Sequence, residues 1–168
     1  VYTYKDVVKN DDGNIVHWSL SKVEEPHGDN ITYSYTKRNG YLYLSETHYT
    51  NHGTTQGAYS VKITLAEGSK NIRRDITTSY RLGFLQTDSE LLDEITVYYK
   101  NELLARYVPT YESGALRKTL LTAITQYDGD GKAVGTNRFD YYDDVKDGLF
   151  GEAKTWDIGN DEALEGKA

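Results

Sequence analysis

Four groups of residues in this chain have the types and spacing that could carry chemistry, and the run Asp128-Gly129-Asp130-Gly131 is the first. Two aspartates at alternate positions could open a calcium loop, which needs oxygen ligands at alternate positions and a glutamate at the twelfth. Here Lys132 occupies the fifth position and Phe139 the twelfth. Because Asp-Gly pairs are favoured in tight turns between strands, we interpret the run as a hairpin turn.

His48 and His52 stand four residues apart, the spacing of a metal-binding pair on one face of a helix. The surrounding segment has the pattern of a strand that runs into a loop. Residues four apart in an extended chain lie far from each other. We therefore expect no metal site here, and we expect His17 and His27 to occupy exposed strand and turn positions.

Glutamates could supply the two facing carboxylates of a glycoside hydrolase, which lie roughly 5–9.5 Å apart. The candidates are Glu24, Glu25, Glu46 and Glu67. Because the chain holds 26 acidic residues, we interpret these four as solvated positions on strands. The sequence contains no G-x-S-x-G elbow, P-loop or Rossmann glycine pattern. We predict no catalytic, cofactor-binding or metal-binding residues, and a hydrolase fragment is the third of three functional hypotheses.

Aromatic residues form the fourth group. Trp18, Trp156 and the tyrosine-rich strands could stack against sugar rings as a glycan-binding platform. Aromatic stripes on strands serve more often as core or sheet surface than as ligand sites. A carbohydrate-binding β-sandwich that uses Trp18 or Trp156 is therefore the second hypothesis.

The composition describes an acidic, cysteine-free chain with the length of one domain, 168 residues. Its net charge of −7 disfavours nucleic acid and anionic lipid as partners, and the lack of cysteine excludes disulfides and thiolate catalysis. No apolar run approaches the roughly 20 residues that span a bilayer, so we expect no membrane insertion. The chain begins at Val1 and holds no methionine, from which we expect a fragment or a processed product.

The hydrophobic pattern predicts an all-β fold of consecutive tyrosine-rich hairpins. There are 16 tyrosines, and tyrosine suits a sheet with one packed face because its ring can be buried while its hydroxyl stays in water. Apolar and polar residues alternate most clearly over 31–36 and 59–65. Within 15–24 we expect Val16, Trp18 and Leu20 to share one face. The expected strands are 1–9, 15–24, 31–36, 41–49, 59–65, 72–82, 94–100, 103–111, 120–127, 133–142 and 151–158.

Some local features are less regular. Residues 86–92 could form one helical turn, with Asp88 or Ser89 as its cap. Residues 112–118 are ambiguous because part of that run favours a helix. Strand 72–82 is expected to be interrupted near Arg73, and the hairpin of 94–100 and 103–111 to turn through Asn101-Glu102 without a glycine. We predict a β-sheet domain over 1–158 and a tail or linker over 159–168.

Soft motifs recur along the chain in a fixed order. A strand ending in tyrosine and then a tight turn occurs at 47–53 and again at 125–131. The pattern Gly13-x-Ile15-x-x-Trp18-x-Leu20-x-Lys22-Val23, followed by NITYSY at 30–35 and YLSETHYT at 43–50, resembles the SpvB family. That family includes the B subunits of insecticidal toxin complexes and overlaps the Rhs/YD-repeat shell proteins. Segments 95–98, 104–111, 120–131 and 139–142 continue the resemblance, which spans residues 1–156, and Tyr127-Asp128-x-x-Gly131 fits the YD-repeat core.

The resemblance implies a function that the residues alone do not. In such proteins this region is a structural β-sheet segment of a large secreted toxin or surface protein, and the sheet winds into a shell that encloses a C-terminal toxic polypeptide. It implies a non-enzymatic antiparallel building block, and this is the first hypothesis. Its partners would be other β-segments of the same polypeptide or toxin complex. It also implies a bacterial, secreted or cell-surface location with an export signal outside this chain. We expect an exposed sheet edge or apolar face.

Overall fold

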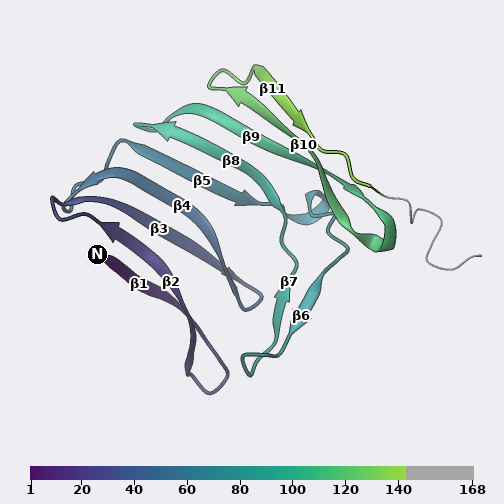
Figure 1. Cartoon of the computed structure of the whole chain (residues 1–168), viewed down its shortest axis with the longest axis horizontal. Coiled ribbons are helices and arrows are strands. Elements are labelled where there is room, and N and C mark those ends of the chain that lie inside the picture. Colours follow the sequence, from purple (N-terminus) through teal and green to yellow (C-terminus); the bar gives the residue numbers. More distant parts are fainter. Residues whose placement is uncertain (143–168) are drawn as a thin grey trace, which may run out of the picture.

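One long antiparallel sheet with a small hairpin attached makes up the fold. The computed structural model describes residues 1–142. Nine strands pair in chain order, β1-β2-β3-β4-β5-β8-β9-β10-β11, and two further strands, β6 and β7, form a separate hairpin (Figure 1). The sheet is open, and the predicted all-β antiparallel meander is confirmed.

The strand bounds agree closely with the predicted pattern over most of the chain. The sheet contains β1 (Tyr2–Lys9), β2 (Ile15–Glu24), β3 (Asp29–Arg38), β4 (Tyr41–His52), β5 (Tyr59–Leu65), β8 (Leu92–Tyr99), β9 (Glu102–Ser113), β10 (Thr119–Asp128) and β11 (Ala133–Arg138). The hairpin contains β6 (Thr77–Ser79) and β7 (Gln86–Asp88). Two short 3₁₀ turns, η1 (Gly68–Lys70) and η2 (Ala115–Arg117), complete the described elements.

Residues in the left-handed region close the hairpins. Asn39 and Gly40 have φ of 49° and 83°, as the type I′ turn predicted between β3 and β4 requires. The β8–β9 turn uses Lys100 and Asn101, with φ of 48° and 71°. This glycine-free turn lies one residue earlier than predicted.

The predictions for 72–92 were wrong in part. Residues 86–92 contain β7 and the start of β8 instead of a helical turn, because tertiary contacts recruit the side chains that could have capped a helix. Asp88 accepts hydrogen bonds from Arg73, and Gln86 donates one to the Gly40 carbonyl. Only Thr77–Ser79 of the expected strand 72–82 forms a strand.

Two predicted elements near the end of the described chain also differ. In the ambiguous run 112–118, Leu116 and Arg117 have φ of 53° and 63°, so the chain turns in a left-handed conformation within η2. β11 ends at Arg138, four residues before the expected strand end. The predicted strand 151–158 and the boundary at 158 lie outside the described residues.

The sheet is a single layer with unlike faces. Cross-strand register places Val61, Val97 and Ala105 in one row across β5, β8 and β9. The adjacent row on the opposite face holds Lys62, Thr96 and Arg106. Among the described residues only four apolar side chains are buried, namely Val8, Ala66, Phe84 and Ala123. Hydrogen-bonded ladders and cross-strand pairs therefore hold this sheet together more than a core does.

Tyrosine rings reinforce the middle of the sheet. The rings of Tyr49 and Tyr59 stack with centroids 5.2 Å apart and planes at 17°, and Tyr59 also meets Tyr99 with centroids 4.9 Å apart. These residues are register partners on β4, β5 and β8. Such pairs contribute about 0.5–1.5 kcal/mol each beyond area burial.

The β6–β7 hairpin lies in the connection between β5 and β8 and packs against the turn between β3 and β4 (Figure 1). The Thr87 N–H donates to the Asn39 carbonyl at 2.9 Å, and Gln86 Nε2 donates to the Gly40 carbonyl at 2.9 Å. A β-carbon on Gly40 would lie 2.9 Å from a ring carbon of Phe84. The absence of a side chain at Gly40 therefore makes room for this hairpin.

The N-terminal hairpin is attached by the shortest ladder of the sheet. β2 and β3 share three residue pairs, whereas β3 and β4 share nine. Beyond these three pairs, the Tyr35 hydroxyl donates to the Leu20 carbonyl at 2.8 Å and bridges the two strands.

Candidate functional site

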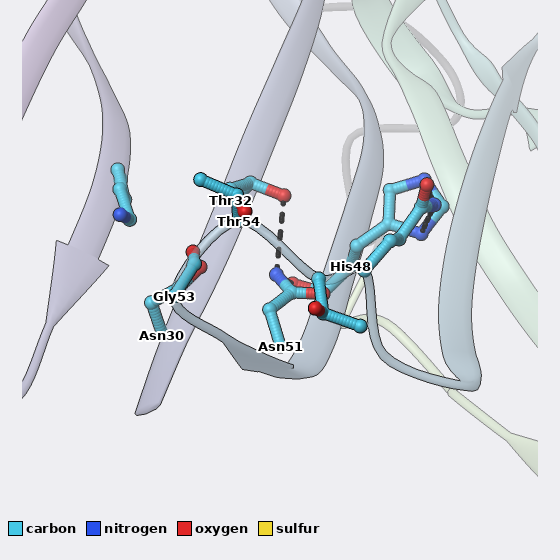
Figure 2. A pocket seen from close by; sticks show the side chains of 9 residues that line it. Asn30, Thr32, His48, Asn51, Gly53 and Thr54 are labelled. Atoms are coloured by element: carbon cyan, nitrogen blue, oxygen red, sulfur yellow. Dashed lines mark hydrogen bonds between the residues drawn. The ribbon is translucent and has the colours of Figure 1, made fainter. Parts of the chain in front are cut away.

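A polar cavity of about 450 Å³ opens beside the end of β4 and the loop that follows it. Figure 2 shows Asn51 between Thr32 and His48, with the loop at Gly53 and Thr54 beside them. Lys22, Asn30, Thr55 and Gln56 complete the lining. Polar side chains of different strands converge here, as they would in a ligand site.

The two buried asparagines of this cavity are used by its own loop. Asn51 is 4% exposed; its amide donates to the His48 carbonyl at 3.0 Å and its oxygen accepts the Gly57 N–H at 2.7 Å. Asn30 is 5% exposed and donates to the carbonyls of Gly28 and Gly53, both at 3.1 Å. These groups have the geometry of loop supports, since their hydrogen bonds fasten the loop to β3 and β4.

The structure gives the two candidate metal-binding histidines different partners. His48 Nε2 lies 3.3 Å from a Glu46 oxygen, and the ring also contacts Gln56. His52 Nδ1 lies 3.0 Å from an Asp29 oxygen, in a pair that is about 70% exposed. Within residues 1–142, no group of three or more His, Asp or Glu side chains could hold a metal ion.

Three of the four candidate hydrolase glutamates lie beside cations. Glu24 pairs with Lys22 at 2.7 Å, and Glu67 pairs with Arg38 at 2.6 Å. Glu46 is next to His48 and lies 3.8 Å from Lys62. Glu25 takes part in the β2–β3 turn, where its carbonyl accepts the Gly28 N–H.

Asp128 serves the turn in which it lies. Its Oδ1 accepts the N–H groups of Asp130 at 3.1 Å and Lys132 at 2.8 Å. Gly131 has a φ of 82° in the same turn. The run 128–131 therefore forms the predicted hairpin turn.

A dense charged cluster, which the sequence did not predict, lies away from the cavity. It joins the insertion between β5 and β8 to the sheet. Arg73 makes two parallel bonds to the Asp88 carboxylate, at 2.9 and 3.0 Å, and a third to the Glu90 carbonyl at 2.9 Å. Arg38 of β3 bonds to Glu90 at 3.2 Å. The only signal in the sequence is the pair Arg73-Arg74 followed by Asp75, near which the predicted strand 72–82 is interrupted.

Two more residues complete the attachment of the insertion. The Tyr43 hydroxyl donates to Asp88 at 3.1 Å. Burial, with the adjacent Asp88 carboxylate as a second cause, raises the pKa of Tyr43 to about 12. On the other side, the Thr119 hydroxyl of β10 donates to Asp75 at 2.8 Å and lowers the pKa of that carboxyl. Because these groups are matched in charge and hydrogen bonding, the cluster acts as an anchor.

Among residues 1–142, the outer strand edges and several apolar side chains are left uncovered. β1 and β11 are the outer strands of the sheet. Every residue of β11 is exposed. On β1, Tyr2 and Tyr4 are 69% and 56% exposed, and on the adjacent strand Trp18 is 56% exposed. Such edges are templates on which another strand can add.

No helix among residues 1–142 has the length and apolar character needed to cross a membrane.

Comparison with known proteins gives a likeness in structure but not in sequence. No family model matches the chain, and no curated protein matches it. The chain is similar to part of the Photorhabdus luminescens Tc holotoxin pore, with a TM-score of 0.60 and 16% identity over 76% of this chain and 9% of that one. It is also similar to part of the TcdB2–TccC3–Cdc42 complex, with a TM-score of 0.59, 15% identity and the same coverage.

A third similar structure is much shorter. The N-terminal domain of the effector SpvB from Salmonella typhimurium strain LT2 has a TM-score of 0.58 and 16% identity over 73% of this chain and 54% of that one. This chain therefore spans from about a tenth to about half of the chains it resembles. At these identities the likeness shows the fold: a β-sheet segment of the kind found in Tc toxin and SpvB structures.

Proposed function

We propose that this chain is a structural wall segment of a toxin-complex-like or Rhs-like β-shell. Other β-segments of the parent protein or complex would continue its sheet and help to enclose a C-terminal toxin. The observation that carries the proposal is the open nine-stranded sheet with only four buried apolar side chains among the described residues. A sheet normally buries one face against another layer. The likeness to Tc toxin and SpvB structures supports a shell as the missing context.

The same proposal includes the absence of enzymatic activity from this chain and a secreted or cell-surface location for the bacterial parent. The buried asparagines, the ion-paired glutamates and the Asp128 carboxylate all have structural partners. Under this proposal the chain acts as a physical barrier and converts no substrate.

The alternative, a glycan-binding module, has one specific observation in its favour. Trp18 is 56% exposed and could offer its ring to a sugar. The second residue of that hypothesis, Trp156, lies outside the described residues. Titration of the chain with oligosaccharides, followed by tryptophan fluorescence, tests the alternative directly: saturable quenching that disappears in Trp18→Phe would favour it over the wall.

The wall proposal is tested by the association of the purified chain. We expect sedimentation velocity to show concentration-dependent association, and we expect the dye ANS to bind to the uncovered apolar face. A monomer at all concentrations that leaves ANS unbound would contradict the proposal.

The outer edge of β11, which has no neighbouring strand among the described residues, allows a matched pair of variants. Phe139 donates its N–H inward to the Thr122 carbonyl, so by strand alternation Asn137 also points its N–H inward and Thr136 points its N–H outward. Thr136→Pro should block addition at this edge and reduce association while circular dichroism stays unchanged. Asn137→Pro, the control, should weaken the β10–β11 pairing itself.

A further inference from the structure

In the segment between η1 and β6, charged side chains point inward and isoleucines point outward, which reverses the usual pattern of burial. Arg73 and Asp75 point inward, with side chains 18% and 25% exposed. The residues between and beside them point outward, and Ile72 and Ile76 are 45% and 51% exposed. Arg74 is exposed as well. This segment therefore buries its charged side chains and exposes its isoleucines. Exposed apolar side chains grouped in this way mark a surface on which another segment can pack.

The β9–β10 connection adds to the same surface. The Arg74 N–H lies 3.3 Å from the Thr119 hydroxyl, which places this segment beside η2 and Lys118. Leu116 of η2 is 60% exposed and has a φ of 53°, an unfavourable conformation for a leucine. We define the basic–apolar patch as Ile72, Arg74, Ile76, Leu116, Arg117 and Lys118. Its three cations make no ion pair with any side chain that the structure describes.

The charges of the chain are distributed so as to complement this patch. Residues 143–168 hold eight Asp or Glu and three Lys, so they carry −5 of the net charge of −7. The same 26 residues include Leu149, Phe150, Trp156 and Ile158. A segment that is both acidic and apolar has the two properties that a basic–apolar surface selects.

The described chain also ends close to the patch. Phe139 donates its N–H to the Thr122 carbonyl, and the Tyr141 hydroxyl donates to the Leu121 carbonyl at 2.8 Å. Leu121 stands two residues from Thr119 on β10, which is roughly 7 Å along a strand. A tether this short gives a following segment an effective concentration at the patch in the millimolar range, about 1 mM or more.

From the inverted exposure, the charge complementarity and this proximity, we propose that the basic–apolar patch is the docking site of the chain's own residues 143–168. Acidic side chains of that segment pair with Arg74, Arg117 and Lys118, and its apolar side chains cover Ile72, Ile76 and Leu116. The inference does not depend on the wall function.

Tryptophan fluorescence tests this in the full chain. The chain has two tryptophans, so Trp18→Phe leaves Trp156 as the only reporter. In that background we expect Trp156 to be shielded from acrylamide. The double variant Arg74→Glu/Lys118→Glu should raise the acrylamide quenching constant about two-fold or more and shift the emission to the red, because it replaces attraction with repulsion.

The control keeps the charge change and moves it elsewhere. Lys9→Glu/Lys37→Glu reverses two exposed lysines on β1 and β3 and should leave quenching unchanged. Ile72→Ser/Ile76→Ser, which removes only apolar side chains of the patch, should also raise quenching. Circular dichroism reports whether each variant keeps its sheet.

The proposal is overturned if Trp156 is quenched as readily as free tryptophan in the background chain. Equal effects of the two charge reversals would also overturn it. Shielding of Trp156 that depends on protein concentration and is lost in Arg74→Glu/Lys118→Glu would assign the patch to a second copy instead.

Discussion

The β6–β7 insertion and the sheet that carries it are built in different ways. The insertion supplies Phe84 and Ala66, two of the four buried apolar residues of the described chain, together with the buried Gln86. It is fixed to the sheet by the bidentate Arg73–Asp88 pair. The nine strands have ladders and stacked tyrosines, but they bury only two apolar side chains, Val8 and Ala123. The difference teaches that the insertion is attached by a few buried side chains and matched charges, whereas the strands are joined mainly by their ladders.

Gly40→Ala is the change expected to affect the insertion most. The new methyl group would lie 2.9 Å from a Phe84 ring carbon and 3.0 Å from the Leu85 carbonyl oxygen, at a φ of 83°. Strain of about 1 kcal/mol and overpacking of about 1–3 kcal/mol should lower the free energy of unfolding by about 2–4 kcal/mol in urea.

Gly131→Ala is the matched control for this change. Gly131 has a φ of 82° in a hairpin turn of the sheet, and nothing lies within 4 Å of its would-be methyl group. It should cost only the strain of about 1 kcal/mol. Equal losses for the two variants would mean that the insertion is no better packed than the sheet.

Alkaline pH should loosen the insertion through Tyr43. Its pKa is about 12 in the folded chain against an ordinary 10.0, so between these values the folded state keeps a proton that the unfolded chain gives up. The stabilisation is therefore complete below pH 10 and is lost as the pH rises to 12, by about 1–3 kcal/mol. Urea unfolding at pH 9 and pH 11.5 measures the loss.

Two tyrosine variants separate this contribution from general alkaline unfolding. Tyr43→Phe should flatten the dependence between pH 10 and 12. Tyr41→Phe should leave it as in the parent, because the Tyr41 hydroxyl has no hydrogen-bond partner within the described chain. A parallel pH dependence in all three proteins would exclude Tyr43 as the cause.

Within the sheet, the effects should be smaller. Tyr59→Leu removes the ring that meets both Tyr49 and Tyr99. It should cost about 1 kcal/mol in urea unfolding. Tyr2→Leu, at a position that is 69% exposed on the edge strand β1, should stay within about 0.5 kcal/mol. A larger loss at Tyr2 than at Tyr59 would show that the edge is covered in solution.

The parts of the fold that could be predicted are those governed by short-range pattern. Alternation and turn residues fixed β2 at Ile15–Glu24 and β5 at Tyr59–Leu65, and Asn39-Gly40 indicated its own turn type. The run 86–92 could not be predicted in this way. Its conformation depends on Gly40 and Arg73, which approach it only after the chain has folded back.

The candidate site shows the same division. The family resemblance led us to expect an exposed sheet edge or apolar face. Nothing in the sequence indicated that Arg73 would be paired twice while its neighbours Ile72 and Ile76 faced outward. Residue types alone suggest the opposite arrangement, since charges usually remain in water and isoleucines do not. Long-range contacts decided this case.

The three-pair ladder between β2 and β3 has a mechanical consequence. A force that pulls the strands apart sideways acts on every ladder of the sheet in series. The ladder with the fewest residue pairs should therefore break first. The hairpin of β1 and β2 would then separate from the sheet as a unit. The hydrogen bond from the Tyr35 hydroxyl to the Leu20 carbonyl would resist this separation, and the strands from β3 onward would stay paired.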